Sequence, residues 1–369
     1  MNYKQFKDIK LSQLGMGAMR LPVLEEGKQA IDYEKGQEVI DYAYSHGINY
    51  YDTAYIYHDG ESEVFLGKAL SKYPRDSFYI ADKFKISANP DYKAQFADQL
   101  RRLNVEYIDF YLLHGLADNN YKRVLECGAV EYFKELKEKG IIKYFGFSFH
   151  GNPNVLREIV SQYDFDFVQI QLNYYDWYYG TAKEQYEILS EHKLPIMVME
   201  PVHGGMLANL NEEAGKVLSD VNDEVSYASW ALRFVRDLDS VCVTLSGMSN
   251  MDQIIDNVKT FEDNTPLNER KLKAIEESCS KTQESIGVVC TGCRYCVEHC
   301  PMGLDIPYLL RLYNEYKLGG TWRLARLKGE DPAKLPSVCI SCGVCTSLCP
   351  QSIKAYEYLR EIADDFETL

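Results

Sequence analysis

The stretch from Ile48 to Lys83, INYYDTAYIYHDGESEVFLGKALSKYPRDSFYIADK, contains one complete repeat of the pattern that decides the fold. It has a β-like run at Ile48–Thr53, a helix-like stretch at Ser62–Ser71 and a second β-like run at Phe78–Lys83. Short apolar runs that alternate with helical stretches are typical of parallel strands joined by helices. This stretch therefore predicts a strand–helix–strand unit.

The same alternation continues on both sides of this stretch, from about residue 10 to residue 260. The further β-like runs are Leu11–Gly17, Ile108–His114, Lys143–Ser148, Phe167–Leu172, Ile196–Glu200 and Val241–Ser246. The further helix-like stretches are Gln37–Ser45, Gln95–Leu103, Val130–Lys139, Asn154–Gln162 and Lys183–Glu191. Eight alternations over about 250 residues predict an α/β fold with a closed (β/α)8 TIM barrel, and an open doubly wound sheet is the alternative.

Polar residues fall at or near the C-terminal ends of these β-like runs. They are Asp52, Lys83, His114, Ser148, Gln169, Glu200 and Ser246. Each has an ordinary structural explanation when it is taken alone, such as a turn cap for Asp52. A barrel builds its active site at the C-terminal ends of its strands, so their joint placement predicts a site there.

The cysteines are concentrated near the end of the chain. Eight of the 11 lie in two runs of equal spacing, Cys290-x2-Cys293-x2-Cys296-x3-Cys300-Pro301 and Cys339-x2-Cys342-x2-Cys345-x3-Cys349-Pro350. In this bacterial ferredoxin pattern, three thiolates of a run hold one 4Fe–4S cluster and the fourth ligates the other cluster. Zinc and disulfides are the alternatives, but neither explains the repeated spacing. The sequence therefore predicts two 4Fe–4S clusters.

The crossing of the fourth ligand defines two ligand sets. Cluster one takes Cys290, Cys293, Cys296 and Cys349, and cluster two takes Cys339, Cys342, Cys345 and Cys300. Between the two runs, apolar residues recur at helical spacing, namely Ile306, Leu309, Leu310, Tyr313 and Tyr316. We therefore expect a barrel over residues 1–280 and a small, mainly helical ferredoxin-like domain over residues 281–369. Cys127, Cys242 and Cys279 lie outside both runs and are assigned no function.

Charge and composition narrow the range of partners. The net charge of −15 repels nucleic acid and anionic membrane surfaces, so we expect neither as a partner. The chain shows no apolar stretch long enough for a membrane span and no signal peptide at its start, which predicts a cytoplasmic protein. With 46% hydrophobic residues, the chain can bury a full core.

The motifs of the barrel region resemble the aldo-keto reductase family, and the cysteine runs resemble the ferredoxin-like extension of one subgroup. The matching segments are Tyr51–Tyr57, Gly60–Glu63, Leu66–Leu70, Ile80–Lys83, Leu112–His114, Gly146–Ser148 and Val168–Gln171. The resemblance implies an oxidoreductase that uses NADH or NADPH on a small carbonyl or alcohol substrate. It also implies four catalytic residues, namely Asp52, Tyr57, Lys83 and His114.

The chemistry of carbonyl reduction agrees with these roles. Hydride transfer develops negative charge on oxygen, which requires a proton and an electrostatic partner. By the resemblance, Tyr57 supplies the proton, Lys83 lowers its pKa as a neighbouring ammonium, and Asp52 holds Lys83. His114 orients the carbonyl oxygen by a hydrogen bond.

The resemblance also implies residues that bind the nicotinamide cofactor. Ser148 and Gln169 are expected at the carboxamide, although Phe149 stands where the family usually has Asn. The phosphates are expected at the loops after strands seven and eight, which contain Gly204, Ser246, Gly247, Met248 and Asn250. No Lys or Arg lies between Ser246 and Val258, where a 2′-phosphate would need a cation, so NADH and NADPH both stay open.

Two functions follow from these features. In the first, the protein is an oxidoreductase whose clusters exchange electrons with the barrel site or with an outside, ferredoxin-like donor or acceptor. In the second, it is an electron carrier or redox sensor whose barrel binds a ligand, such as a flavin, without turnover. The aromatic tract Tyr174–Tyr179 is either a wall of the site, a contact with the cluster domain or packing of a loop.

Overall fold

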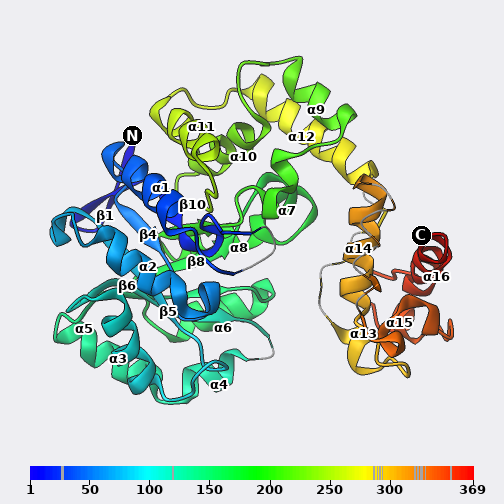
Figure 1. Cartoon of the computed structure of the whole chain (residues 1–369), viewed down its shortest axis with the longest axis horizontal. Coiled ribbons are helices and arrows are strands. Elements are labelled where there is room, and N and C mark those ends of the chain that lie inside the picture. Colours follow the sequence, from blue (N-terminus) through cyan, green and yellow to red (C-terminus); the bar gives the residue numbers. More distant parts are fainter. Residues whose placement is uncertain are drawn as a thin grey trace. The chain divides into compact units, whose positions relative to one another are not determined.

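Figure 1 shows the computed structural model of the chain. The structure describes residues 1–25, 29–118, 120–285, 287–288, 290, 292, 294–319, 321, 324, 327–328, 330–349 and 351–369. The chain divides into two compact units, which are Met1–Asn209 with Leu218–Glu276, and Leu210–Val217 with Glu277–Leu369.

The first unit is a closed barrel of eight parallel strands, which confirms the predicted fold. The order around the barrel is β10, β3, β4, β5, β6, β7, β8 and β9. The strands are β3 (Leu14–Gly17), β4 (Tyr50–Asp52), β5 (Tyr79–Phe84), β6 (Ile108–Leu116), β7 (Ile142–Phe149), β8 (Phe167–Gln171), β9 (Ile196–Met199) and β10 (Val241–Ser246).

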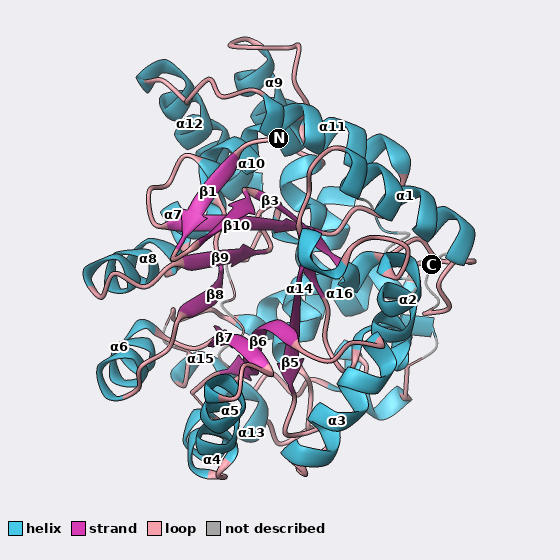
Figure 2. Ribbon diagram, turned by 90° about the vertical axis from the view of Figure 1, so that its left-hand side faces the viewer, coloured by secondary structure: helices cyan, strands magenta, loops and turns pink. Residues whose placement is uncertain are grey.

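Helices surround this ring of strands, as Figure 2 shows for α1, α2, α3, α5, α6 and α8. The helices of this unit are α1 (Tyr33–Ser45), α2 (Glu61–Leu70), α3 (Tyr92–Leu103), α4 (Tyr121–Glu126), α5 (Ala129–Glu138), α6 (Pro153–Gln162), α7 (Tyr174–Tyr179), α8 (Ala182–Glu191), α10 (Tyr227–Arg236) and α11 (Met251–Glu262), whereas α9 (Glu212–Ser219) belongs mostly to the second unit. Many of them begin at a side chain that accepts a backbone N–H of the first turn, among them Asp32, Asp91, Asn152, Asn173, Ser226 and Asn250. Such caps satisfy donors that would otherwise lack a partner.

The predicted first strand, Leu11–Gly17, is in fact two strands. β1 (Tyr3–Phe6) and β2 (Ile9–Ser12) form an antiparallel hairpin, and only β3 enters the barrel. The break falls at Gln13, where the Ser12 hydroxyl donates to the carbonyl of Leu14 at 2.7 Å. The apolar run Leu11–Gly17 predicts a single strand, because the sequence does not show that the backbone turns at Gln13.

The hairpin closes the barrel at the N-terminal ends of its strands. Phe6 is 1% exposed, and its ring packs at 5.3 Å from Phe110, 5.0 Å from Tyr144 and 6.3 Å from Phe167. These three residues lie near the starts of β6, β7 and β8. The floor of the barrel is thus a layer of aromatic rings.

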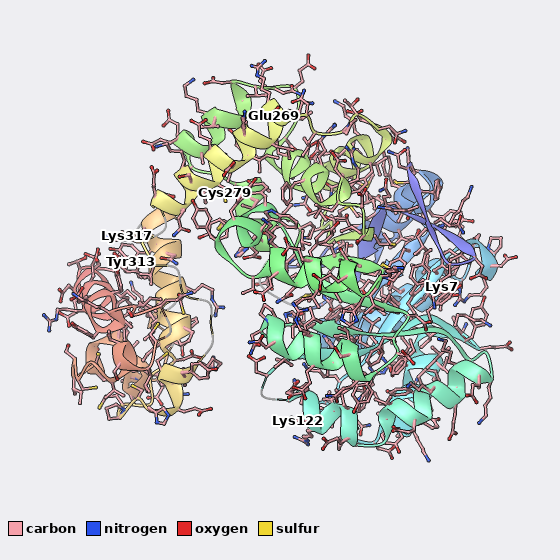
Figure 3. All side chains as sticks on the ribbon, turned by 180° about the vertical axis from the view of Figure 1, so that it is seen from behind. Lys7, Lys122, Glu269, Cys279, Tyr313 and Lys317 are labelled. Carbon is pink, nitrogen blue, oxygen red and sulfur yellow. The ribbon has the colours of Figure 1, made fainter. Side chains whose placement is uncertain are left out.

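The second unit is mainly helical, as predicted. Its helices are α12 (Glu269–Ser285, which begins in the first unit), α13 (Tyr295–Glu298), α14 (Ile306–Gly319), α15 (Val344–Ser347) and α16 (Ala355–Glu367). α14 and α16 share a core that contains Ile306, Leu309, Leu310, Leu359 and Ile362. Tyr313 and Lys317, labelled in Figure 3, lie one turn apart on α14 and both contact Glu361 of α16. In the described part of the chain, no helix has the length and apolar character that a membrane crossing requires.

The segment Leu210–Val217 belongs to the second unit by its contacts with α12. Asn211 donates to the Ser285 hydroxyl at 2.7 Å, and the Ser278 hydroxyl donates to the carbonyl of Ala214 at 2.9 Å. This segment lies far from the cysteine runs in the sequence. A domain boundary at one residue near 280 therefore leaves it in the barrel domain.

Candidate functional site

A buried ion pair lies at the C-terminal end of the barrel. The Lys83 ammonium donates to Asp52 Oδ1 at 2.7 Å and also to the carbonyl of Thr53. The side chain of Lys83 is 0% exposed and that of Asp52 is 4% exposed. Asp52 is the last residue of β4, and β5 pairs beside β4, so the barrel itself brings these two side chains together.

Each partner of this pair favours the charged form of the other. Burial disfavours a lone ammonium, but Asp52 and Tyr57 outweigh burial and raise the pKa of Lys83 above its usual value. Burial also raises the pKa of the Asp52 carboxyl, and Lys83 opposes that rise. A charged pair this deeply buried loses much of its hydration, so each partner depends on the other.

Tyr57 lies in the loop after β4, and its ring is beside the Lys83–Asp52 ion pair. It opens a turn, η2 (Tyr57–Gly60), in which His58, Asp59 and Gly60 have φ values of 50°, 56° and 92°. The buried His58 ring holds this turn, because its Nε2 accepts the Leu21 N–H at 3.3 Å. Lys83 Nζ lies 5.1 Å from the centroid of the Tyr57 ring.

The pKa of Tyr57 differs from the expectation. We expected the Lys83 ammonium to lower it, and Lys83 does act in that direction. Burial is the larger effect, however, and the pKa of Tyr57 lies above 10.0. The expected effect of Lys83 is therefore present, but the sequence did not show the burial of the phenol that outweighs it. The phenol therefore keeps its proton at neutral pH.

His114 completes the group of four. Its ring stands edge-on to that of Tyr57, with centroids 6.0 Å apart and planes at 88°. Burial and the ammonium groups of Lys83 and Lys85 hold the pKa of His114 well below 6.5, so the imidazole is neutral. Its Nδ1 atom is buried without a hydrogen-bond partner among the described residues. The structure thus brings together all four residues that the sequence singled out as catalytic.

A second layer supports Lys83, and the sequence analysis missed it. The backbone N–H of Lys83 donates to Asp82 Oδ1 at 2.8 Å, and the Gln99 amide donates to the carbonyl of Lys83 at 3.1 Å. Gln99 also donates to Glu63 at 3.1 Å, and Arg102 pairs with Glu63 at 2.8 Å. The Gly60–Glu63 and Ile80–Lys83 motifs, which contain Glu63 and Asp82, were the sequence signals for this network. It fixes the strand that carries Lys83.

Ser148 and Gln169 lie side by side at the ends of β7 and β8, where they pair in register. Both are buried, and the Ser148 hydroxyl accepts the Gly115 N–H at 2.8 Å. Gln169 Oε1 is buried and has no hydrogen-bond partner among the described residues. An amide N–H of a ligand would satisfy this oxygen, so the two residues fit a carboxamide group.

The loops after β9 and β10 contain the residues expected at the cofactor phosphates. Gly204 has a φ of 65° in the first loop, and Gly247 lies in the second. Ser246 and Met248 are buried, and Ser246 accepts from Asn257 at 3.0 Å. Asn250 caps α11 by accepting the Gln253 N–H at 3.0 Å. The side chain of Asn250 is therefore engaged within the protein.

Arg20 brings a cation to these two loops. It ends the short helix η1 (Ala18–Arg20) after β3, and the Ser249 hydroxyl donates to its carbonyl at 2.8 Å. A Cβ atom added to Gly247 would lie 3.0 Å from Arg20 Cβ, and one added to Gly204 would lie 3.8 Å from Arg20 Nη2. The side chain of Arg20 therefore spans from one loop to the other. Its distance in sequence from both loops explains why the sequence analysis missed it.

The aromatic tract forms the short helix α7. Tyr174 and Trp177 pack against Phe234 of α10, with ring centroids 6.2 and 5.6 Å apart. Tyr175 contacts the ring of His203 at 5.5 Å, and His203 pairs with Asp176 at 3.3 Å. These contacts favour loop packing for most of the tract.

In the second unit, the cysteines line two hollows, each with an empty volume of about 360 Å³ that is partly open to solvent. One hollow is lined by Cys300, Cys339, Cys342 and Cys345, and the other by Cys290, Cys296, Cys345 and Cys349. Each hollow thus combines residues of one run with the fourth cysteine of the other run. Cys293 lies outside the described residues.

The arrangement of these cysteines fits the way a cluster is held. A 4Fe–4S cluster takes one thiolate at each of four iron corners, so its ligands surround a hollow. Cys242 and Cys279 are buried elsewhere, and Cys127 donates to the carbonyl of Val124.

Comparison with known proteins agrees with both sites. The sequence matches the aldo/keto reductase family over residues 13–279 and a 4Fe-4S dicluster domain over residues 289–353. An uncharacterized oxidoreductase of Bacillus subtilis, YqkF, is 25% identical over 313 residues, which are 76% of this chain and 95% of that protein. An NADH-specific methylglyoxal reductase of Escherichia coli is 25% identical over 221 residues, which are 54% of this chain and 66% of that protein.

A solved structure shares the barrel. The holo form of the aldo-keto reductase AKR11C1 from Bacillus halodurans is 29% identical, with a TM-score of 0.63, and the alignment covers 75% of this chain and 96% of that one. The family match spans most of the chain and includes all four residues around the Asp52–Lys83 pair. The protein therefore belongs to the aldo/keto reductase family, with a 4Fe-4S dicluster domain after its barrel.

Proposed function

We propose that the barrel reduces a carbonyl compound, or oxidises the corresponding alcohol, with NADH or NADPH. The observation that carries this proposal is the buried Lys83–Asp52 ion pair, with the Tyr57 and His114 rings beside it. A buried charged pair costs free energy and is often retained for chemistry rather than for stability. The bound nicotinamide would supply the hydride.

Tyr57 is the proposed proton donor. Its raised pKa keeps the proton on the phenol at neutral pH, so the donor is in its active form. Donation to a carbonyl oxygen leaves a phenolate, and the Lys83 ammonium stabilises that negative charge. Asp52 keeps Lys83 charged and in place.

His114 is proposed to orient the carbonyl oxygen. A neutral imidazole holds one ring N–H and so can donate a single hydrogen bond. Because the pKa of His114 is well below 6.5, the ring is a poor source of protons near neutral pH. Positioning, rather than acid catalysis, is the role that fits its charge state.

The residues that would hold the nicotinamide are Ser148 and Gln169 for its carboxamide, and the loops around Gly204 and Gly247 for the phosphates. The unpartnered Gln169 Oε1 supports the first contact. Arg20 supports the second, because its guanidinium can pair with phosphate oxygens.

We expect NADH to bind at least as well as NADPH. A 2′-phosphate needs a cation near the adenosine end of the cofactor, and Ser246–Val258 has no Lys or Arg. Calorimetry with both cofactors measures the ratio of their dissociation constants. The expectation is contradicted if NADPH binds more tightly by more than about 1.4 kcal/mol, which is a tenfold ratio. The Escherichia coli relative named NADH-specific supports the same preference.

Arg20→Gln serves as the companion variant in this titration. If Arg20 contacts phosphates that both cofactors share, Arg20→Gln weakens NADH and NADPH by similar factors. A loss confined to NADPH instead assigns Arg20 to the 2′-phosphate and overturns the expected preference.

The dicluster domain would exchange single electrons with an outside carrier, such as a ferredoxin. Nicotinamide moves electrons in pairs, whereas a 4Fe–4S cluster accepts one at a time. Under anaerobic conditions, we expect a reduced low-potential ferredoxin to bleach the visible cluster absorption and NADH or NADPH alone to leave it largely unchanged. Rapid bleaching by NADH alone would instead indicate direct exchange with the barrel site.

A further inference from the structure

A second lysine points into the same end of the barrel as Lys83. Side chains alternate between the two faces of a strand, so Lys85, two residues after Lys83, follows it on the inner face. β5 and β6 pair Lys83 with Leu112 and Phe84 with Leu113, which places Lys85 at the level of His114. Lys85 is half-buried. It therefore lies one layer above the Asp52–Lys83 pair, toward the barrel mouth.

Gly115 makes room for this ammonium. It follows His114 with a φ of 68°, and a Cβ atom added there would lie 3.2 Å from Lys85 Nζ and 3.9 Å from the ring of His150. Lys85 and His150 therefore face the same small space from two sides. A side chain at position 115 would fill that space.

The ammonium of Lys85 has no counter-ion. In the part of the chain that the structure describes, no carboxylate pairs with it and no acceptor receives a hydrogen bond from Nζ, and burial lowers its pKa. The titratable groups that it faces are the imidazoles of His114 and His150, whose pKa values are lowered by burial and by Lys85 itself. The carboxylate of Glu200 acts on His150 and on His203. Lys83, by contrast, is paired with Asp52.

The fold does not require this lysine side chain. The backbone N–H and carbonyl of Lys85 bond to the Gln95 amide at 2.7 and 3.1 Å, and any residue could make those bonds. A half-buried charge without a partner costs free energy. A stabilising structural role would lead us to expect a partner, and the structure shows none among the described residues.

We propose that Lys85, with His150 beside it, binds an anionic group of the carbonyl substrate. The substrate class is then an oxo acid or a phosphorylated carbonyl compound, in which an oxyanion sits at the barrel mouth and the carbonyl reaches Tyr57 and His114. The assignment rests on the proposed carbonyl chemistry, because it places the anion relative to those residues. An oxyanion satisfies the ammonium by charge-assisted hydrogen bonds.

The test compares charged and neutral carbonyl compounds of similar shape. Succinic semialdehyde is compared with 4-oxobutanamide, and glyceraldehyde 3-phosphate with glyceraldehyde, in the cluster-loaded full-length protein. We expect the wild type to prefer the charged member of at least one pair, and Lys85→Gln to lower that preference in kcat/KM by roughly tenfold or more. The two pairs separate a carboxylate from a phosphate.

Two further variants control for unspecific damage. Lys85→Arg keeps a cation at the site and should restore most of the preference. Lys72→Gln removes an exposed lysine that pairs with Asp41 and should leave the preference as in the wild type. Equal preference for charged and neutral compounds in the wild type, or a preference that survives Lys85→Gln, overturns the proposal.

A binding measurement separates this proposal from the proposed function. Calorimetric titration with succinate and succinamide needs no turnover. Suppose that no carbonyl compound is reduced, but succinate binds and its affinity falls at least tenfold in Lys85→Gln. The anion site is then supported and the proposed carbonyl chemistry is wrong. If carbonyl compounds are reduced and the affinity for succinate is the same in Lys85→Gln as in the wild type, the proposed anion site is wrong and the carbonyl chemistry is unaffected.

Discussion

Tyr57→Phe lowers the rate of carbonyl reduction by about 10²-fold or more, because it removes the proton donor and keeps the ring. The expected loss corresponds to about 2.7 kcal/mol in the barrier. The lost hydroxyl interacts with Lys83, whereas the Gln169 amide, which is proposed to hold the cofactor, donates to Met199. Cofactor binding, measured by calorimetry, should therefore survive.

Lys83→Met should reduce turnover to a similar extent, since it removes the charge that stabilises the phenolate. The structure adds a second effect, because the buried Asp52 carboxylate then loses its counter-ion. Breaking a buried pair from one side typically costs about 3–5 kcal/mol of stability. The double variant Asp52→Asn/Lys83→Met removes both charges, so it should fold better than Lys83→Met and stay as inactive.

These variants distinguish the two candidate functions. None of them alters a cysteine, so iron content and reduction by an artificial one-electron donor should match the wild type. An electron carrier or redox sensor would be indifferent to all of them. Undiminished turnover in Tyr57→Phe would falsify the proton-donor role and direct attention to His114 or to a bound flavin.

The second large effect concerns the crossed cysteines. The intact protein, purified anaerobically, should contain roughly eight iron and eight acid-labile sulfide per chain. Cys349→Ser and Cys300→Ser should each lose one cluster, or about four iron. Stoichiometric zinc without sulfide would contradict the cluster assignment as a whole.

Double variants show which cysteines serve the same cluster. Cys349 and Cys290 line one hollow, so Cys349→Ser/Cys290→Ser should lose no more iron than Cys349→Ser alone. Cys349→Ser/Cys342→Ser removes a ligand from each set and should lose both clusters. If the two double variants behave in the opposite way, each run holds its own cluster and the crossing is wrong.

Much of the catalytic group could be predicted, because the barrel converts a position in the sequence into a position in space. Asp52, Lys83 and His114 stand at or near the ends of neighbouring strands, and neighbouring strand ends meet at one face of the barrel. The crossed cysteine sets stay a prediction from the spacing of the two runs. Regular secondary structure and regular residue spacing fix the relative positions of side chains, so these positions can be inferred from the sequence.

The features that escaped prediction depend on irregular segments or on burial. Arg20 reaches Gly204 and Gly247 across loops whose path the sequence does not specify. The pKa of Tyr57 depends on how deeply the phenol is buried, and that depth appears only in the folded structure. Lys85 was visible in principle, since it follows Lys83 by two residues in a strand, but its lack of a partner was not.

The aromatic rings around Phe6 close the barrel at the N-terminal ends of its strands. Because the rings of Phe110, Tyr144 and Phe167 pack against Phe6, the described residues block access to Lys83 from that end and leave the loop side open. If the barrel binds a nicotinamide and a substrate as proposed, both enter from the loop side, and the one that reaches deeper enters first and leaves last. We therefore expect a compulsory order of binding, as a consequence of the hairpin at the opposite end of the barrel.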